Sequence, residues 1–346
     1  IERIDGRPSD NNGYARTELK RINLTRGSVI AHLEWMGIVS SELTERLTFL
    51  DTKIHYLTPL PDVVLSRFCH THAGNKETHC EMVSWNCDGL RRTLGKEVEF
   101  LQTLAQLNPR IILLQETKLY KGTTEESALH ALGAYFPDHQ WYANSATKTK
   151  GYSGVLTGFR KDVKHSVCPA PTQFADEGRL QAFTVFSKEG TYSLIHTYTL
   201  NSGQDMKRRD DRMGYERDLR ALVSTLQRQP QAPPICAVGD FNALWDIHNG
   251  VHRKFKHQIN VYPSCYMYEH RLLHRFADQT RLVRLDPPQR DSYTFYPSER
   301  DSQLRRGLTF DYAFMSPTLK ESFRLTYMTP GRGFDHSALV LSRDIT

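Results

Sequence analysis

The stretch Ile111-Ile112-Leu113-Leu114-Gln115-Glu116-Thr117-Lys118 contains four consecutive apolar residues, followed by Gln115 and then by the carboxylate of Glu116. Such a run has the length of a buried strand and falls far short of the about 18 apolar residues that a membrane span requires. The residues on either side, 96–107 and 125–135, favour helices. We therefore expect a buried strand between two helices, with Glu116 at the mouth of a sheet.

The alternation of strands and helices continues to the end of the chain. We expect further strands over residues 82–86, 154–159, 180–186, 192–199, 235–239, 310–315 and 337–341, and further helices over residues 213–228 and 268–277. Strands interleaved with helices, several of them adjacent along the chain, predict an α/β layered domain with a largely antiparallel or mixed sheet.

The composition is that of a globular protein. Of the 346 residues 39% are hydrophobic and 24% are charged, which excludes a wholly disordered chain and a collagen-like repeat. The formal net charge of +6 suits a polyanionic partner without proving one. Six cysteines at irregular spacing fit reduced intracellular thiols better than a disulfide framework.

The first 80 residues differ from the rest of the chain in composition and in the pattern of their apolar positions. Residues 1–20 are polar, and we expect them to be poorly ordered, whereas apolar positions at helical spacing over residues 27–68 predict two short helices. The chain begins with Ile1, so we expect a fragment or a processed product. It carries no apolar core of a secretory signal, and we expect an intracellular protein.

A group of cysteine and histidine residues ends this segment: Cys69, His70, His72, His79 and Cys80. These are the residue types that bind Zn²⁺, but their spacing matches no standard zinc motif. We therefore favour a surface loop over a zinc site.

Polar residues that can bind a metal ion or a phosphate recur where the predicted strands end. Asn86 and Asp88 are two residues apart, as are Asp240 and Asn242, so each pair faces one side of an extended chain. The carboxylate of Glu116 is a ligand type that hard cations such as Mg²⁺ prefer. A simple turn is the alternative at each place, because Asn and Asp favour turns.

Further polar residues follow in later loops. Asp335 and His336 precede the last predicted strand, and Asp311 is the candidate to orient the imidazole through its other nitrogen. Tyr198 and Asn201 can supply donors to a phosphate. With 15 histidines in the chain, a structural role is the alternative for His336.

Taken together and in this order, these residues resemble the endonuclease/exonuclease/phosphatase superfamily, and most closely the exonuclease III class of apurinic/apyrimidinic (AP) endonucleases. The resemblance covers about residues 82–342 and is carried by the strings SWNCDGLR (84–91), LLQETK (113–118), GYSGV (151–155), EGRLQAF (177–183), GDFNA (239–243) and FDHSAL (334–339). Six strings in one order make a strong signal, although none is specific alone.

The resemblance implies a four-layered α/β sandwich of two facing mixed sheets flanked by helices, with the active site at one edge. It assigns residues 81–346 to an endonuclease/exonuclease/phosphatase catalytic domain. Residues 1–80 would form an N-terminal extension of unknown function.

The resemblance also implies roles for the site residues. Asp240 would orient or activate the attacking water, and His336, held by Asp311, would polarise the scissile phosphate. The implied catalytic residues are Tyr198, Asp240, Asn242, Asp311 and His336. The implied metal ligands, for Mg²⁺ with Mn²⁺ as an alternative, are Asp88, Glu116 and Asp335. The implied substrate-binding residues are Asn86, Asn201, Phe295 and Tyr296.

The implied function is that of a metal-dependent DNA phosphodiesterase, an AP endonuclease and 3′-repair nuclease of base excision repair that cuts the backbone 5′ to abasic sites. The implied partner is double-stranded DNA that contains abasic sites. The protein is expected to be a monomer that does not bind a membrane, located in the nucleus of a eukaryote or the cytoplasm of a prokaryote. Candidate contacts to the DNA backbone, each with a solvated surface charge as its alternative, are Arg91, Arg92, Lys118, Lys148, Lys150, Arg208 and Arg212.

Several departures from the class pattern bear on lesion specificity. Gln204 stands where eukaryotic members have an arginine that inserts into DNA, Leu200 replaces a proline, and Tyr296 replaces a tryptophan. The class pattern Gly-Phe-Thr-x-x-Glu-Arg, in a segment that normally helps to position the DNA, is missing between Asn242 and Tyr293. Two alternatives therefore stay open: a retrotransposon-type endonuclease that nicks undamaged DNA, and a non-catalytic nucleic-acid-binding or scaffold relative.

Overall fold

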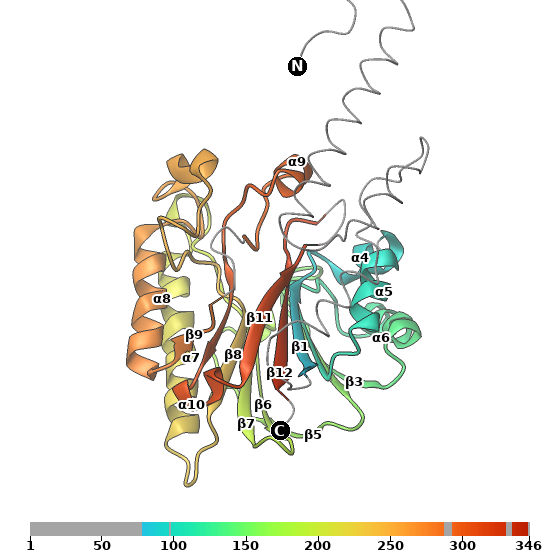
Figure 1. The fold of residues 1–346 in the computed structure, drawn as a ribbon. Helices are drawn as coiled ribbons and strands as arrows, with labels where there is room; N and C mark the ends of the chain where they lie inside the picture. The colour runs from blue at the N-terminus through green and yellow to red at the C-terminus, as the bar shows by residue number, and fades with distance from the viewer. Residues whose placement is uncertain (1–77, 97, 287–292, 330–333, 345–346) are drawn as a thin grey trace, which may run out of the picture. The chain divides into compact units, whose positions relative to one another are not determined.

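The computed structural model describes residues 78–96, 98–286, 293–329 and 334–344 (Figure 1). The contacts of the chain divide it into residues 1–68 and residues 69–346, and the described residues all belong to the second unit. The predicted helices over residues 27–68, and Cys69, His70 and His72, lie outside the described residues.

Two six-stranded sheets form the centre of the described unit. The first sheet has the order β11 (Phe323–Met328), β12 (Ala338–Asp344), β1 (Thr78–Asn86), β2 (Ile111–Gln115), β4 (Val155–Arg160), β3 (His139–Asn144). The second has the order β5 (Lys164–Cys168), β6 (Leu180–Phe186), β7 (Tyr192–Tyr198), β8 (Ile235–Asp240), β10 (Asp311–Met315), β9 (Val283–Arg284). In each sheet a central pair runs parallel, β1 with β2 and β7 with β8, among antiparallel neighbours.

Helices cover the outer face of each sheet (Figure 1). The helices α4 (Leu90–Lys96), α5 (Val98–Gln106) and α6 (Thr123–Tyr135) flank the first sheet, and α7 (Arg209–Gln227) and α8 (Met267–Thr280) flank the second. Short helices lie in the loops: η1 (Ala175–Glu177), η2 (Gln204–Met206), η3 (Arg253–Gln258), α9 (Glu299–Gln303) and α10 (Pro317–Lys320). The four layers confirm the predicted α/β sandwich.

The core lies between the two sheets, because alternate residues of a strand point to opposite faces. Met82 and Leu113 of the first sheet and Leu194 and Val238 of the second belong to one buried apolar cluster. A second cluster joins the outer face of the second sheet to α7 and α8, through residues such as Phe314. No helix in the described ranges is both long and apolar enough to cross a bilayer.

Some elements differ from the prediction. The helix predicted over residues 96–107 corresponds to α5, while Lys96 is the last residue of α4. The strands β3, β5, β9 and β11 were not predicted. β1 begins at Thr78, where it pairs with Asp344, so residues 78–80 lie in a sheet although the predicted boundary follows residue 80. His79 of this strand contacts Glu81 (2.7 Å) and is not part of a surface loop.

Candidate active site

The predicted site residues converge where the strands of both sheets end. The parallel pairs bring the last residues of β1 and β2, and of β7 and β8, to the same edge. β10 starts at that edge, and its first residue, Asp311, is the register partner of Asp240 at the end of β8. Segments that are far apart in the sequence thus deliver their polar residues to one place.

The buried amide of Asn86 joins the two sheets at this edge. The Asn86 Nδ2 atom donates hydrogen bonds to Glu116 Oε2 (3.2 Å) and to Asp240 Oδ2 (3.0 Å). Asn86 and Asp240 are each 1% exposed. The carboxylates of Glu116 and Asp240, 124 positions apart in the numbering (240 − 116), therefore face one another across one side chain.

Asp240 is held in place by Asn242. The backbone N–H of Asn242 donates to Asp240 Oδ1 (2.8 Å), and Asn242 Nδ2 donates to Thr199 O (2.9 Å). Burial, and then the charge of Asp311, raise the pKa of Asp240 to about 7, although the charge of His336 opposes this. A carboxyl group with a pKa near 7 is suited to take a proton from water.

The glycine before Asp240 is a steric requirement. Gly239 has φ of 145°, and a Cβ atom there would lie 1.9 Å from the carbonyl oxygen of Thr197 in β7. No side chain fits at this distance, so glycine allows β7 and β8 to pair up to the site.

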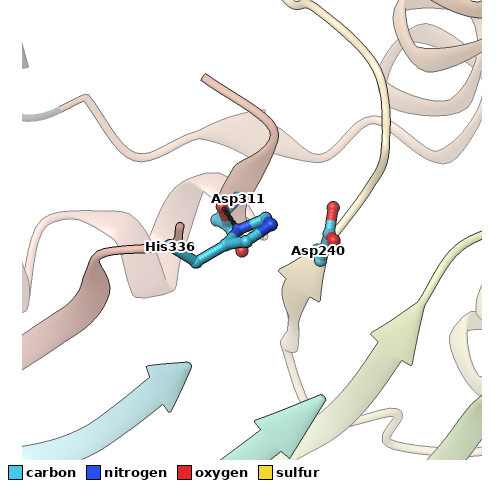
Figure 2. Close-up of side chains that lie close together, drawn as sticks. All are labelled: Asp240, Asp311 and His336. Carbon is cyan, nitrogen blue, oxygen red and sulfur yellow. Dashed lines mark hydrogen bonds and ion pairs between the residues drawn. The ribbon is translucent and has the colours of Figure 1, made fainter. Parts of the chain in front are cut away.

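His336 and Asp311 form a buried pair opposite Asp240. His336 Nδ1 lies 2.9 Å from Asp311 Oδ2, and Figure 2 shows the imidazole beside both carboxylates. Burial alone lowers the pKa of His336, but the charge and hydrogen bond of Asp311, with Asp335 and Asp240 nearby, raise it to about 10. His336 is therefore a cation at neutral pH, fit to stabilise negative charge on a phosphate.

Carboxylates also gather around Glu116. Lys118 Nζ contacts both Asp88 Oδ1 (2.5 Å) and Glu116 Oε1 (3.0 Å), which places these two carboxylates side by side. Burial raises the pKa of Asp335; the charge of His336 opposes the rise, and the charges of Asp88 and Glu116 add to it. Within the described part of the chain, the buried Asp335 Oδ1 atom has no hydrogen-bond partner.

This set of oxygen donors fits a hard divalent cation, which binds carboxylates and neutralises their mutual repulsion. A second group adjoins it: Asp240, Asp311 and His336 each offer one ligand atom, and these atoms lie within 4.8 Å of one another. In that group His336 Nδ1 and Asp311 Oδ2 are paired with each other, while the buried Asp311 Oδ1 atom has no hydrogen-bond partner among the described residues. The site thus offers a cation two adjoining groups of donors, one around Glu116 and one formed by Asp240, Asp311 and His336.

Three of these residues have a backbone conformation that side chains rarely adopt. Asp88, Glu116 and Asn242 have φ of 42°, 53° and 46°. Left-handed conformations at residues other than glycine store strain and concentrate at functional sites. The structure thus combines strained backbone with buried charge at the same edge.

Tyr198 and Asn201 lie at the end of β7 and on the loop that follows it. The guanidinium of Arg179 lies over the Tyr198 ring, 4.6 Å from its centroid. Burial and the charge of Glu116 hold the pKa of Tyr198 well above 10, so the phenol remains a proton donor. Asn201 Oδ1 accepts a hydrogen bond from Gly203 N (3.0 Å), which orders the turn that carries it.

The two aromatic residues of the predicted substrate pocket also border the site. The Phe295 ring lies 5.0 Å from the His336 ring and 5.2 Å from the Phe310 ring. Tyr296 is buried, and its hydroxyl donates to Tyr293 O (3.0 Å). Phe295 therefore shields the imidazole, while the role of both residues toward substrate stays a prediction.

Two residues that hold the site in place were not predicted from the sequence, Ser264 and Glu269. Ser264 Oγ donates to Asn242 Oδ1 (2.8 Å). Glu269 Oε1 accepts from Ser202 N (2.9 Å), and Glu269 Oε2 accepts from Tyr266 N (3.1 Å) at the start of α8. One buried carboxylate thus ties the loop that carries Asn201 to the segment that carries Ser264. The sequence signature of such a helix start has Ser or Thr three residues before the Glu, whereas Tyr266 stands there, so no sequence pattern pointed to Glu269.

The prediction that Arg212 contacts DNA is wrong. Arg212 is 0% exposed, and its Nη1 atom donates to Leu200 O (2.6 Å), so it supports the Asn201 loop from inside. Lys118 and Arg92 are paired with Asp88, and Arg208 is paired with Glu177. Three other candidates are exposed, and for them DNA contact stays a prediction: Arg91, Lys148 and Lys150.

Comparisons with known proteins agree with this geometry. The model of the endonuclease/exonuclease/phosphatase family matches residues 83–332. An exodeoxyribonuclease of Streptococcus pneumoniae serotype 4 is 26% identical over 285 residues, which span 77% of this chain and 100% of the relative. The DNA repair nuclease APEX1 of Danio rerio is 27% identical over 259 residues, which span 72% of this chain and 77% of the relative.

A solved structure has the same fold. The AP endonuclease of Leishmania major superposes with a TM-score of 0.66 at 19% identity, covering 78% of this chain and 88% of the other. The family match over residues 83–332 spans most of the chain and includes Glu116, Asp240 and Asp311. On these grounds the chain belongs to the endonuclease/exonuclease/phosphatase family.

Proposed function

We propose that this protein is a divalent-cation-dependent DNA phosphodiesterase of base excision repair, an AP endonuclease and 3′-repair nuclease that cuts the backbone 5′ to abasic sites. The observation that carries the proposal is the Asn86 amide, which binds both Glu116 and Asp240 beside the His336–Asp311 pair. Relatives that are named exodeoxyribonuclease and DNA repair nuclease support DNA as the substrate.

The buried groups have complementary tasks in such a hydrolysis. Asp240, oriented by Asn242, takes a proton from the attacking water, whose oxygen forms a bond to phosphorus as the bond to the 3′-oxygen breaks. The negative charge that develops on the phosphate oxygens meets the His336 cation and the hydrogen-bond donors of Asn86, Tyr198 and Asn201. The proton acceptor and the charge-stabilising donors thus come from different sides of the site.

Glu116, with Asp88 and Asp335 close by, would hold the divalent cation. When bound, Mg²⁺ or Mn²⁺ supplies Lewis-acid stabilisation of the charged phosphate. Lys118 contacts two of these carboxylates, so it would share their charge with the cation. Double-stranded DNA as the partner, a monomeric protein and an intracellular location belong to the same proposal.

Three duplex substrates in the presence of Mg²⁺ test the function: one with a single abasic site, the same sequence intact, and a supercoiled plasmid. We expect a cut 5′ to the abasic site and little cutting of the intact DNA. Equal cutting of the undamaged plasmid would favour the retrotransposon-type alternative, which the missing class segment after Asn242 makes the second candidate. No cutting above that of Glu116→Gln would refute the phosphodiesterase.

A further inference from the structure

A buried histidine links the two sheets next to the candidate site. His196 lies on β7, two residues before Tyr198, and is 0% exposed. Its Nε2 atom lies 2.7 Å from Gln115 Nε2, and its Nδ1 atom lies 2.9 Å from Thr157 Oγ1. Gln115 and Thr157 lie on β2 and β4 of the other sheet, so His196 contacts both from across the interior. The resemblance gives none of these three residues a role.

The contacts continue as a chain of hydrogen bonds between the sheets. Thr157 Oγ1 donates to Gln181 Oε1 (2.7 Å) on β6, and Gln181 Nε2 donates to the carbonyl oxygen of Tyr142 (2.9 Å) on β3. Every link from Gln115 to Tyr142 therefore joins one sheet to the other. A polar group is costly to bury unless it is hydrogen-bonded, and a hydrogen-bonded network in a dry interior holds its members in one arrangement. These links thus hold the two sheets in a fixed position beside the site.

The two ends of the chain determine the protonation of the imidazole. Gln115 Nε2 also donates to the carbonyl oxygen of Leu113 (3.2 Å), and Gln181 Nε2 faces a carbonyl oxygen in the same way, so both amides present their NH2 groups there. Gln115 therefore donates to His196 Nε2, although its Oε1 atom has no hydrogen-bond partner within the described ranges. Thr157 gives its proton to Gln181 and accepts from His196 Nδ1–H. The chain requires a neutral imidazole protonated on Nδ1, and burial supplies it by lowering the pKa of His196 to about 3.

The chain begins beside the proposed cation ligand. Glu116 has φ of 53°, and a strained residue persists only where the surrounding structure holds it. The backbone oxygen of Gln115 accepts from Cys87 N (3.0 Å), and the Gln115 side chain donates to Ser84 Oγ (3.0 Å). With the further bond to His196, both the backbone and the side chain of Gln115 are anchored, which holds Glu116 in its left-handed conformation.

The same histidine lies on the strand end that carries Tyr198. His196 and Tyr198 are two residues apart on β7, so their side chains point to the same face of the sheet. After burial, the charge of Glu116 contributes most to the raised pKa of Tyr198, so these two side chains are neighbours across the gap between the sheets. The contact of His196 with Gln115 is therefore followed by a second cross-sheet contact, one step closer to the site.

We propose that His196 is a positioning residue of the cation site: through Gln115 it sets the place of the Glu116 carboxylate without contacting the cation or the substrate. The inference rests on the proposed function, in which Glu116 holds the divalent cation. Groups that orient a metal ligand from outside the coordination shell change metal affinity or activity by about 10- to 100-fold when they are replaced.

Binding of Mn²⁺ to the full chain, followed by the electron paramagnetic resonance signal of the free ion, tests the proposal without any need for substrate. His196→Leu removes the bridge, yet Gln115 keeps Ser84 and Leu113 as acceptors. We expect this variant to raise the Kd for Mn²⁺, and the Mg²⁺ concentration for half-maximal cutting, by about 10-fold or more. His196→Gln offers one acceptor and one donor group, and should bind Mn²⁺ within about threefold of the wild type.

A matched control and a second variant accompany this pair. Tyr192→Phe is the control, because Tyr192 starts the same strand β7 and its buried hydroxyl donates to Glu81 Oε1 (2.7 Å) at the end away from the site. This control should melt below the wild type and bind Mn²⁺ equally well. Thr157→Val removes the acceptor of the Nδ1 proton with little change of shape. It should raise the Kd for Mn²⁺ in the same direction, and it carries the test if His196→Leu does not fold.

The outcomes separate the positioning role from the proposed function. A folded His196→Leu that binds Mn²⁺ as tightly as Tyr192→Phe would overturn the role of His196 alone. A loss in His196→Gln as large as in His196→Leu would overturn the hydrogen-bonded chain as its cause. A wild type that binds Mn²⁺ but cuts no DNA would overturn the proposed function, while the Mn²⁺ affinities of the variants would still decide the role of His196. A wild type that binds no Mn²⁺ would overturn both.

Discussion

At the scale of single residues, the site depends on buried charges that compensate one another. The pKa of His336, about 10, and the pKa of Asp240, about 7, both depend on Asp311. The Asp311 carboxylate pairs with the His336 imidazole and repels the Asp240 carboxylate. His336 has a pKa above its usual value, so this pairing stabilises the folded protein fully below about pH 6.5 and is lost as the pH rises through about 10.

We therefore expect Asp311→Asn to move the alkaline limit of cleavage to a lower pH. Without the Asp311 charge and hydrogen bond, burial brings the pKa of His336 down, and only the charges of Asp335 and Asp240 still oppose the fall. We expect the variant to lose activity at a lower pH than the wild type as the pH rises. Rates measured between about pH 5.5 and 9 check this, with Asp162→Asn, an exposed carboxylate paired with Arg160, as the control. An alkaline limb at the same pH in Asp311→Asn would contradict the assignment.

The sequence predicted individual site residues better than it predicted the arrangement of the strands. Asn86, Glu116, Asp240 and His336 stand in short strings at strand ends, and the structure brings them together. Ser264 and Glu269 act through partners 22 and 67 positions away (264 − 242 and 269 − 202), so no local pattern reveals them. Arg212 was misplaced because it stands among the charged residues of the run 207–217, which gives no sign that one of them is buried.

At the scale of elements, β7 and β8 must pair closely for Asp240 to reach the site. Gly239→Ala should destabilise the protein by at least about 2 kcal/mol, since a Cβ atom would collide with Thr197 O. Gly133→Ala is the control: Gly133 lies within α6, and apart from its chain neighbours and the helix's own backbone no atom lies within 4 Å of the position that its Cβ atom would take. Alanine should therefore stabilise the helix by about 0.5–1 kcal/mol. Urea unfolding measures both, and equal midpoints for the two variants would contradict the steric argument.

The link between α8 and the Asn201 loop gives a second prediction at this scale. Glu269→Ala removes the acceptor shared by Ser202 N and Tyr266 N, so the loop loses its order. We expect a raised KM for duplex DNA and a smaller change in kcat, because the role proposed for Asn201 is to position substrate. Glu269→Gln keeps an acceptor oxygen and should recover part of the loss. A purely structural role would instead lower the midpoint of unfolding equally in both variants and leave KM unchanged.

The elements that were not predicted share a physical reason. β3 and β5 are edge strands with mixed, half-exposed residues, and β9 has two residues, so none gives an apolar alternation. β11 does alternate, with Phe323 and Leu325 buried and Arg324 exposed, and a stricter test of periodicity would have found it. The central strands β2 and β8 were predicted from their runs of apolar residues, and the structure buries every residue of each.

At the scale of the whole molecule, the layered α/β class followed from the alternation of strands and helices, whereas the pairing of two facing sheets came from the resemblance. Periodicity reports which face of a strand is buried but not which strand lies beside it. Strand neighbours such as β12 and β1 are distant in sequence, and their pairing depends on contacts that a local pattern does not contain.

The predicted division of the chain into an N-terminal extension and a catalytic domain is tested by a truncation experiment. All candidate site residues follow residue 85, and the family match begins at residue 83. We expect a chain that begins at residue 78, the start of β1, to keep hydrolysis within about threefold of the full chain. Loss of activity in a truncated chain that remains folded by circular dichroism would place part of the site in residues 1–77.

The central claim is that carboxylates and a histidine from both sheets form one cation-dependent hydrolytic pocket. The most direct measurement is the single-turnover rate on an abasic duplex with Mg²⁺ for the wild type, Glu116→Gln, Asp240→Asn and His336→Ala. We predict that each variant melts like the wild type yet cuts at least about 100-fold more slowly, and that EDTA abolishes cutting by the wild type. A folded variant of any of the three that cuts at the wild-type rate, or cutting that persists in EDTA, would contradict the claim.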